Sequence, residues 1–347
     1  MELFPSNSNV DFLGWRKISI AISIVLMIVS IALITTRGLN YALDFTGGVL
    51  VEVEYQQPVE IGQVREALEK GGIRNSVVQS LGGTREVSIR LQPEGEQKEA
   101  ADRIAADVLS KLKATRSDVS LKRHDFVGPQ VGEELKSDGM IAVVFVIIGI
   151  MIYIGIRFEK RFAIAAIASE FHDTILTVGF FALTQREFDL TVLASVLAVV
   201  GYSINDKVVV FDRVRELFRT ARKADSYEVL NRAINQTLSR TIMTSLTTAL
   251  SMFALYFFGG PAVHGFALTM LIGIVIGTLS SIFFANPILY WLGVSKKDLM
   301  PVNSEVMMVR DSVLLIAWFS TCSGSALRVM RNISRTRSNT TTLSLIE

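Results

Sequence analysis

The sequence predicts a polytopic α-helical membrane protein with six transmembrane helices and one external α+β domain of the ferredoxin-like kind. Half of the 347 residues are apolar, and the mean hydropathy is +0.41. The apolar residues are gathered into blocks of about 20, the length that crosses a bilayer. Between the first two blocks lies a mixed segment, residues 37–137, with strand-like and helix-like periodicities.

Six apolar blocks predict six spans. They cover residues 18–36, 138–156, 162–183, 190–211, 241–258 and 263–291. The first block follows Arg16 and Lys17, and no small-residue cleavage site comes after it, so we expect an uncleaved anchor. The single cysteine, Cys322, excludes an intrachain disulfide and a cysteine metal cluster.

The distribution of lysine and arginine predicts the orientation. Basic residues lie before span one, between spans two and three, in the 212–240 loop and after span six. The opposite loops contain Arg186 alone. By the positive-inside rule, residues 1–17 and 296–347 are cytoplasmic and residues 37–137 are periplasmic. The tail after residue 303 is rich in Ser, Thr, Arg and Asn, which favours disorder.

Residues 37–137 contain alternating strand and helix patterns. Strands are predicted at 49–55, 77–81, 86–91 and 119–126, a hairpin turn at Gly82-Gly83, and helices at 58–70 and 96–113. The order β-α-β-β-α-β is that of the ferredoxin-like split βαβ arrangement. His124 is alone and the acids are spread over helix faces, so we expect a binding or force-bearing surface here, not an active site.

Span four contains a carboxylate within an apolar run. Asn205, Asp206 and Lys207 follow one another, six residues before the run stops at Asp212 and Arg213. At about 1.5 Å per residue, Asp206 lies roughly 9 Å inside that boundary. Lysine can reach the headgroups from there and aspartate cannot. An intramembrane acid is by default a functional candidate, so we predict a buried functional Asp206 and no catalytic role for Lys207. The alternative is the wet end of a helix.

Span three opens with Glu170, His172 and Asp173. Adjacent residues on a helix point about 100° apart, and no second ligand pair follows, so no metal site is predicted. Asp173 lies near the predicted midplane. Either it takes part in a proton path, or it forms a hydrogen-bonded pair that holds spans together.

Spans five and six contain small and hydroxyl residues at helical spacing. Arg240 precedes a stripe formed by Thr241, Thr244, Ser245, Thr248 and Ser251. The stripe suits either packing or a hydrated path. Span six places a small residue at every fourth position, at Gly265, Thr269, Gly273, Gly277 and Ser281, which predicts close packing against another helix.

Several short motifs resemble the SecD/SecF family, and its SecF members in particular. They are Asp44-Phe45-Thr46-Gly47-Gly48, Gly128-Pro129-x-Val131-Gly132, His172-Asp173, Gly201-Tyr202-Ser203-Ile204-Asn205-Asp206 with the following 208–216 segment that contains Asp212 and Arg213, the 237–241 run, and 277–281. They follow one another in the family's order, and the resemblance covers about residues 10–295.

The resemblance implies that the six spans form an RND-type half bundle. It also implies a function. A SecF protein pairs with a SecD subunit, associates with the Sec translocon and uses the proton-motive force, with no cofactor, to assist late export of unfolded polypeptides across the bacterial inner membrane. The family's proton pathway maps to Asp206, Asn205 and Arg240, with Asp173 as a further candidate. Position 207 departs from the family, where it is usually small and polar. Beside the acid, Lys207 is expected to favour its ionised form and to slow protonation.

Two other functions stay open. A small-molecule efflux transporter of the RND superfamily shares intramembrane acids, but it normally has larger external domains and twelve spans. A non-transporting scaffold that stabilises the partner assembly would not need the polar residues in spans three to five. An enzyme is disfavoured because no nucleophile–base set, phosphate loop or metal site is visible. Nucleic-acid binding is disfavoured because topology explains the basic loop.

Overall fold

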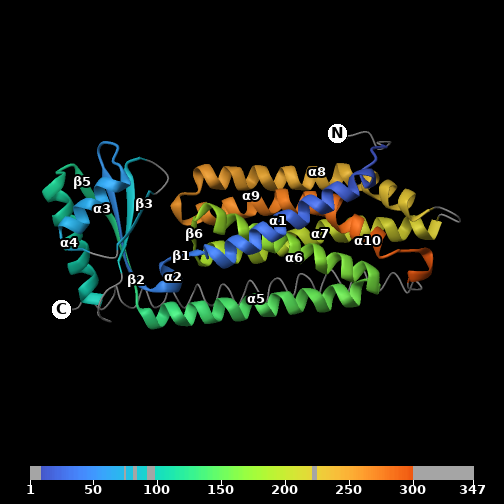
Figure 1. Cartoon of the computed structure of the whole chain (residues 1–347), viewed down its shortest axis with the longest axis horizontal. Helices are drawn as coiled ribbons and strands as arrows, with labels where there is room; N and C mark the ends of the chain where they lie inside the picture. The colour runs from blue at the N-terminus through green and yellow to red at the C-terminus, as the bar shows by residue number, and fades with distance from the viewer. Residues whose placement is uncertain (1–8, 74–75, 81–83, 92–97, 221–224, 300–347) are drawn as a thin grey trace. The chain divides into compact units, whose positions relative to one another are not determined.

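The computed structural model describes residues 9–73, 76–80, 84–91, 98–220 and 225–299. Within these, six helices are long and apolar enough to cross a membrane, which confirms the predicted fold class. They are α1 (Arg16–Thr36), α5 (Pro129–Arg157), α6 (Lys160–Thr184), α7 (Leu190–Thr220), α8 (Ser226–Phe258) and α9 (Pro261–Ser280), the last continued by a π-helical turn (Ser281–Ala285) and α10 (Asn286–Trp291). Figure 1 shows α1, α6, α7, α8 and α9 running alongside one another.

Several helices are longer than their apolar blocks. Helix α5 begins at Pro129, where the missing N–H of proline costs nothing because first-turn amides have no helical acceptor. Helix α7 continues to Thr220 and α8 begins at Ser226, so most of the predicted 212–240 loop is helical and that prediction is wrong. Hydropathy finds only the part of a helix that lies in hydrocarbon, whereas polar helix ends continue beyond it.

Helix α9 packs closely against α7 through its glycines. A Cβ on Gly265 would lie 2.8 Å from Val192, and one on Gly277 would lie 2.8 Å from Ser203. Gly273 faces Val199 still more tightly. The small residues that the sequence places at every fourth position therefore face α7, and they let the two backbones approach.

The α+β domain contains β2 (Gly48–Tyr55), α3 (Ile61–Lys70), β3 (Val77–Ser80), β4 (Glu86–Leu91), α4 (Lys98–Thr115) and β5 (Val119–Val127). The sheet order is β3-β4-β2-β5, and every pairing is antiparallel. This is the predicted ferredoxin-like topology. The register shifts once, between Glu52 and Val53, where β2 meets β5. The predicted Gly82-Gly83 turn and the tail after residue 303 lie outside the described residues.

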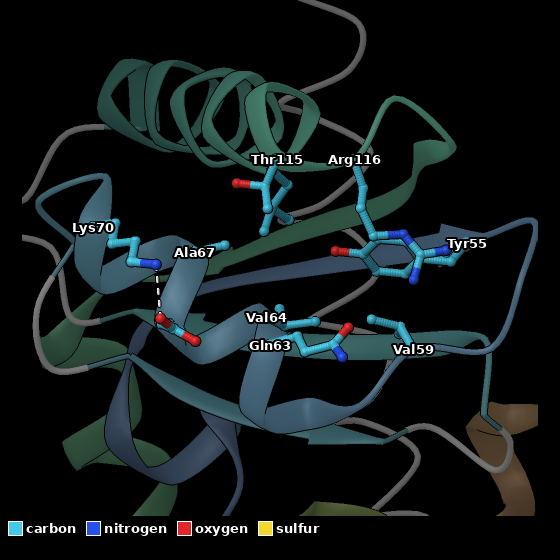
Figure 2. Close-up of a pocket in the computed structure, with 10 residues that line it drawn as sticks. Tyr55, Val59, Gln63, Val64, Ala67, Lys70, Thr115 and Arg116 are labelled. Atoms are coloured by element: carbon cyan, nitrogen blue, oxygen red, sulfur yellow. Dashed lines mark ion pairs between the residues drawn. The ribbon is translucent and has the colours of Figure 1, made fainter.

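The domain core lies on one face of this sheet. Alternate residues of β2 point into it (Val49, Val51, Val53 and Tyr55) and meet the apolar faces of α3 and α4. A cleft of about 220 Å³ lies between α3 and the end of α4. Figure 2 shows the residues that line it. Tyr55 lines it, and the Arg116 guanidinium lies 5.2 Å from the centre of that ring. Arg116 is held by two hydrogen bonds to Asp118, at 2.9 and 2.6 Å.

A short second pairing was not predicted. β1 (Asn40–Tyr41) pairs in parallel with β6 (Glu187–Phe188), which joins the segment after α1 to the turn between α6 and α7. Arg90 of β4 contacts both strands: it donates one hydrogen bond to the Tyr41 carbonyl and one to Glu187, each 2.6 Å long. The Arg90 side chain is 9% exposed and that of Glu187 is 35% exposed, so this contact is partly buried.

The short helix α2 (Leu43–Thr46) and Gly47-Gly48 connect α1 to the sheet. Both glycines have positive φ angles, 64° and 126°, which residues other than glycine rarely adopt. A Cβ on Gly47 would lie 2.8 Å from the Cα of Pro129. The Asp-Phe-Thr-Gly-Gly and Gly-Pro-x-Val-Gly motifs, far apart in sequence, are thus in contact.

Candidate functional site: two carboxylates at the α6–α7–α9 contact

Asp206 lies on α7 between two other elements. Its Oδ1 accepts a hydrogen bond from Thr241 of α8 (2.6 Å), and its Oδ2 accepts one from Ser281 of the π-helical turn (2.7 Å). The sequence predicted a buried carboxylate, whereas Asp206 is half-buried. The reason is its position on α7: the adjacent Asn205 is exposed, so the described chain leaves this side of the helix uncovered. Two hydroxyl donors from other elements still hold the carboxylate on that side.

A line of hydroxyls continues from Asp206 towards the start of α7. Tyr202, one turn earlier, donates to Ser245 of α8 (3.3 Å), which in turn shares a hydrogen bond with Thr278 of α9 (2.7 Å). Part of the predicted stripe on α8 therefore faces α7 and α9. Thr244, Thr248 and Ser251 instead donate to carbonyls of their own helix. Hydroxyls that both donate and accept are suited to passing protons.

Arg240 is exposed on α8, one residue before Thr241. Among the residues that the structure describes, it forms no ion pair with Asp206. Arg240 and Asp206, which the resemblance assigns to one proton pathway, are therefore not an ion pair in this conformation.

Lys207 is long enough to reach the headgroups, but its side chain does not lie there. It is 0% exposed and points towards α6, where its Nζ lies 2.5 Å from Glu170 Oε1 and 2.7 Å from Asp173 Oδ2. Adjacent residues on a helix point about 100° apart, so Asp206 and Lys207 face different neighbours. The sequence shows both partners, but only tertiary packing shows that α6 covers the lysine's face.

Asp173 of α6 is 1% exposed and accepts hydrogen bonds from two other helices, α7 and α9. Its Oδ2 accepts from Ser203 (2.5 Å) and Lys207 of α7 and from Ser280 of α9 (2.7 Å). Its Oδ1 lies 2.8 Å from Nδ1 of His172, which stacks on Phe284. Asp173 thus holds three helices together, whatever its part in proton movement. Among the described residues, no group of three or more His, Cys, Asp or Glu side chains is arranged to hold a metal ion.

The other motif residues lie at the two ends of the helices. Asp44 accepts a hydrogen bond from the Leu190 amide at the start of α7 (3.2 Å), and Phe45 packs in an aromatic cluster with Phe181 and Phe188. At the opposite end of α7, Asp212 pairs with Arg157 of α5 (2.6 Å). Arg213 donates to Gln236 of α8 (2.8 Å), and Gly201 lies within α7 beside Tyr202.

Two family models match this chain. The model "Protein export membrane protein SecD/SecF, C-terminal" matches residues 107–295, and "SecD/SecF GG Motif" matches residues 32–59. The chain belongs to the SecD/SecF family. It is 45% identical to the protein translocase subunit SecF of Pseudomonas aeruginosa over 86% of this chain and 96% of that protein, and 43% identical to SecF of Haemophilus influenzae over 85% and 90%.

Solved SecD/SecF structures agree with this fold. The crystal structure of SecDF, a translocon-associated membrane protein from Thermus thermophilus, superposes with a TM-score of 0.75 at 33% identity over 84% of this chain. A SecDF structure in a super-membrane-facing form superposes with a TM-score of 0.61 at the same identity and coverage. This chain covers 40% of each solved chain.

Proposed function

We propose that this multi-pass membrane protein is a subunit of the Sec protein-export machinery that pairs with a SecD-like subunit and uses the proton gradient to assist late translocation of unfolded polypeptides. Membership of the SecD/SecF family supports the export role. The SecDF match supports the pairing, because this chain accounts for 40% of a longer single-chain relative. The uncovered side of α7 and α8 would face the SecD-like subunit, and the Sec channel would bind the assembly.

The observation that carries the proton-coupled part is the environment of Asp206. A carboxylate inside a membrane helix, held by hydroxyls from two other elements, can exist in both protonation states without losing its hydrogen bonds. We infer that protons reach it along Tyr202, Ser245 and Thr278 and leave on the side of Arg240. A proton that crosses the membrane releases about 2.3 kcal/mol per 100 mV. Arg240, moving closer in another conformation, would favour release.

The orientation is part of the proposal. Basic residues gather at one end of the helices: Arg157 pairs with Asp212, and Arg16 lies 5.3 and 5.1 Å from the ring centres of Tyr227 and Tyr290. This end would be cytoplasmic in a bacterial inner membrane, with both termini there and the α+β domain in the periplasm. Asp44 and Arg90 then join the periplasmic domain to the start of α7, the helix that contains Asp206.

Proton flux in vesicles that contain this chain and its SecD-like partner tests the proposal. Flux and export should both be lost in Asp206→Asn, while Asp138→Asn, which changes an exposed acid of α5, should behave as wild type. Wild-type flux and export in the Asp206 variant would refute Asp206 as the carrier. If neither protein conducts protons, yet deletion of the whole chain stops export, a scaffold is the better function.

A further inference from the structure

Four ionisable side chains form a closed cluster between α6 and α7, separate from the hydrogen bonds of Asp206. All four are buried: Glu170 is 6% exposed, His172 4%, Asp173 1% and Lys207 0%. Lys207 bridges both carboxylates, and His172 contacts Asp173. Asp206 shares none of these partners. A role for Asp206 alone leaves this cluster without a function.

The charges of the cluster do not balance. With Lys207 protonated, Glu170 and Asp173 ionised and His172 neutral, it has one excess negative charge. An uncompensated buried charge costs several kcal/mol, and the cluster avoids that cost by binding one more proton. We propose that Glu170, His172, Asp173 and Lys207 form a second proton-binding site, in which the fixed charge of Lys207 allows one exchangeable proton to bind and leave.

Two atoms can receive this proton. Oε2 of Glu170 and Nε2 of His172 are both buried and have no hydrogen-bond partner within the described part of the chain. When Nδ1–H of His172 donates to Asp173, Nε2 has a free lone pair. A proton from water then binds Nε2 to give the imidazolium, and release returns it to water with no other bond changed. The imidazolium beside Asp173 makes the cluster neutral.

His172, unlike Glu170, also lies beside a hollow. A hollow of about 370 Å³ lies between α1, α6 and α9, and His172 and Ser280 form part of its wall. Ser19 and Ser23 of α1 add hydroxyls, and the hollow extends to Trp15 at the start of that helix. None of the residues that line it is an acid, a lysine or an arginine. His172 contacts Asp173, and Asp173 in turn pairs with Lys207, which also pairs with Glu170. We therefore assign proton exchange to His172.

Nitrogen NMR of histidine-labelled full chain in lipid nanodiscs tests the assignment. The chain has three histidines, so each signal is identified by substitution. In wild type, the His172 signal should titrate with pH. Glu170→Gln keeps an oxygen for Lys207 but removes one negative charge, so His172 should stay neutral. Lys207→Gln removes the positive charge, so His172 should stay protonated. The two variants should thus act in opposite directions.

His124 and His264 are the internal controls, because His124 pairs with Asp102 in the α+β domain and His264 stacks on Tyr256. The signals of His124 and His264 should be the same in wild type and in both variants. A His172 signal that does not titrate, or that responds alike to both variants, would overturn the proposal, and either variant suffices if the other fails to fold. This proposal deepens the proposed function and rests on it. The NMR measurement needs neither the partner subunit nor export, so its outcome is independent of the flux experiment that tests Asp206 as the carrier.

Discussion

Ser280 and Ser281 are adjacent in the chain and donate hydrogen bonds to two different carboxylates, Ser280 to Asp173 and Ser281 to Asp206, each at 2.7 Å. The helix changes there from α9 to its π-helical turn. π-Helical turns inside α-helices are frequent at functional sites. Here the turn places one element of the chain in contact with both acids, so movement of α9 would alter both together.

Ser281→Ala should weaken the hold on Asp206 and leave the Asp173 cluster intact. A hydrogen bond to a charged group contributes about 1.5–3 kcal/mol, which is roughly a ten- to hundredfold change in equilibrium. We expect proton-driven export to fall while membrane abundance stays normal. The comparison variant is Ser280→Ala, which removes one of four contacts to Asp173 and should instead lower thermal stability. Equal export in Ser281→Ala and wild type would contradict this role.

Lys207 and Glu170 should depend on each other for stability. Breaking a buried ion pair by removing one partner costs about 3–5 kcal/mol, because the other charge is left unpaired. Lys207→Ser should therefore lower the thermal unfolding temperature strongly, and the double variant Lys207→Ser with Glu170→Leu should recover much of the loss. Additive effects of the two changes would contradict the coupling. As a control, Glu216→Gln breaks an exposed pair with Arg213 and should have little effect.

The sequence predicted the helices and the α+β topology because both depend on local periodicity. Asp206 was found because a carboxylate in an apolar run is rare whatever packs beside it. Lys207 was misjudged because its direction depends on which helix covers its face. The Arg90–Glu187 contact and the β1–β6 pairing were missed for the same reason: they join segments with no shared periodicity. Glu170 was named but given no role, although an acid and a lysine in two apolar spans suggest a buried pair.

Gly47→Ala should prevent normal folding at the joint between α2 and α5. The added Cβ would lie 2.8 Å from Pro129, and a residue other than glycine at φ 64° and ψ 173° costs about 1–3 kcal/mol more. We expect low membrane abundance and a lowered unfolding temperature. Gly62→Ala is the matched control, because it lies in α3 with nothing within 4 Å of its added Cβ. It should be neutral or slightly stabilising, and a normal Gly47→Ala protein would show that the joint tolerates a side chain.

Asp118 should give the α+β domain part of its resistance to acid. Its hydrogen bonds with Arg116 lower the pKa of the carboxyl below its ordinary value. The carboxyl therefore has a lower pKa in the folded protein than in the unfolded chain, where it is about 3.9. The ion pair stabilises the fold fully above that pH, and this stabilisation is lost as the pH falls through the folded-state pKa. Asp118→Asn should reduce stability at neutral pH and flatten its decline in acid, as measured by thermal unfolding across pH. A variant with the same pH profile of stability as wild type would show that the Arg116–Asp118 pair does not contribute to acid resistance.

Arg90→Ala should separate proton movement from export. Arg90 joins β4 to Tyr41 and Glu187, next to the start of the helix that contains Asp206. Without the Arg90 side chain, the helices should still conduct protons. Movement of α7 should then be transmitted less well to the α+β domain, so export should fall more than proton flux. Arg90→Lys should not rescue, because a lysine cannot form the same two directed bonds. Arg123→Ala, an exposed arginine on β5 of the same sheet, is the matched control. A parallel loss of flux and export in Arg90→Ala would instead show that this contact only supports the fold.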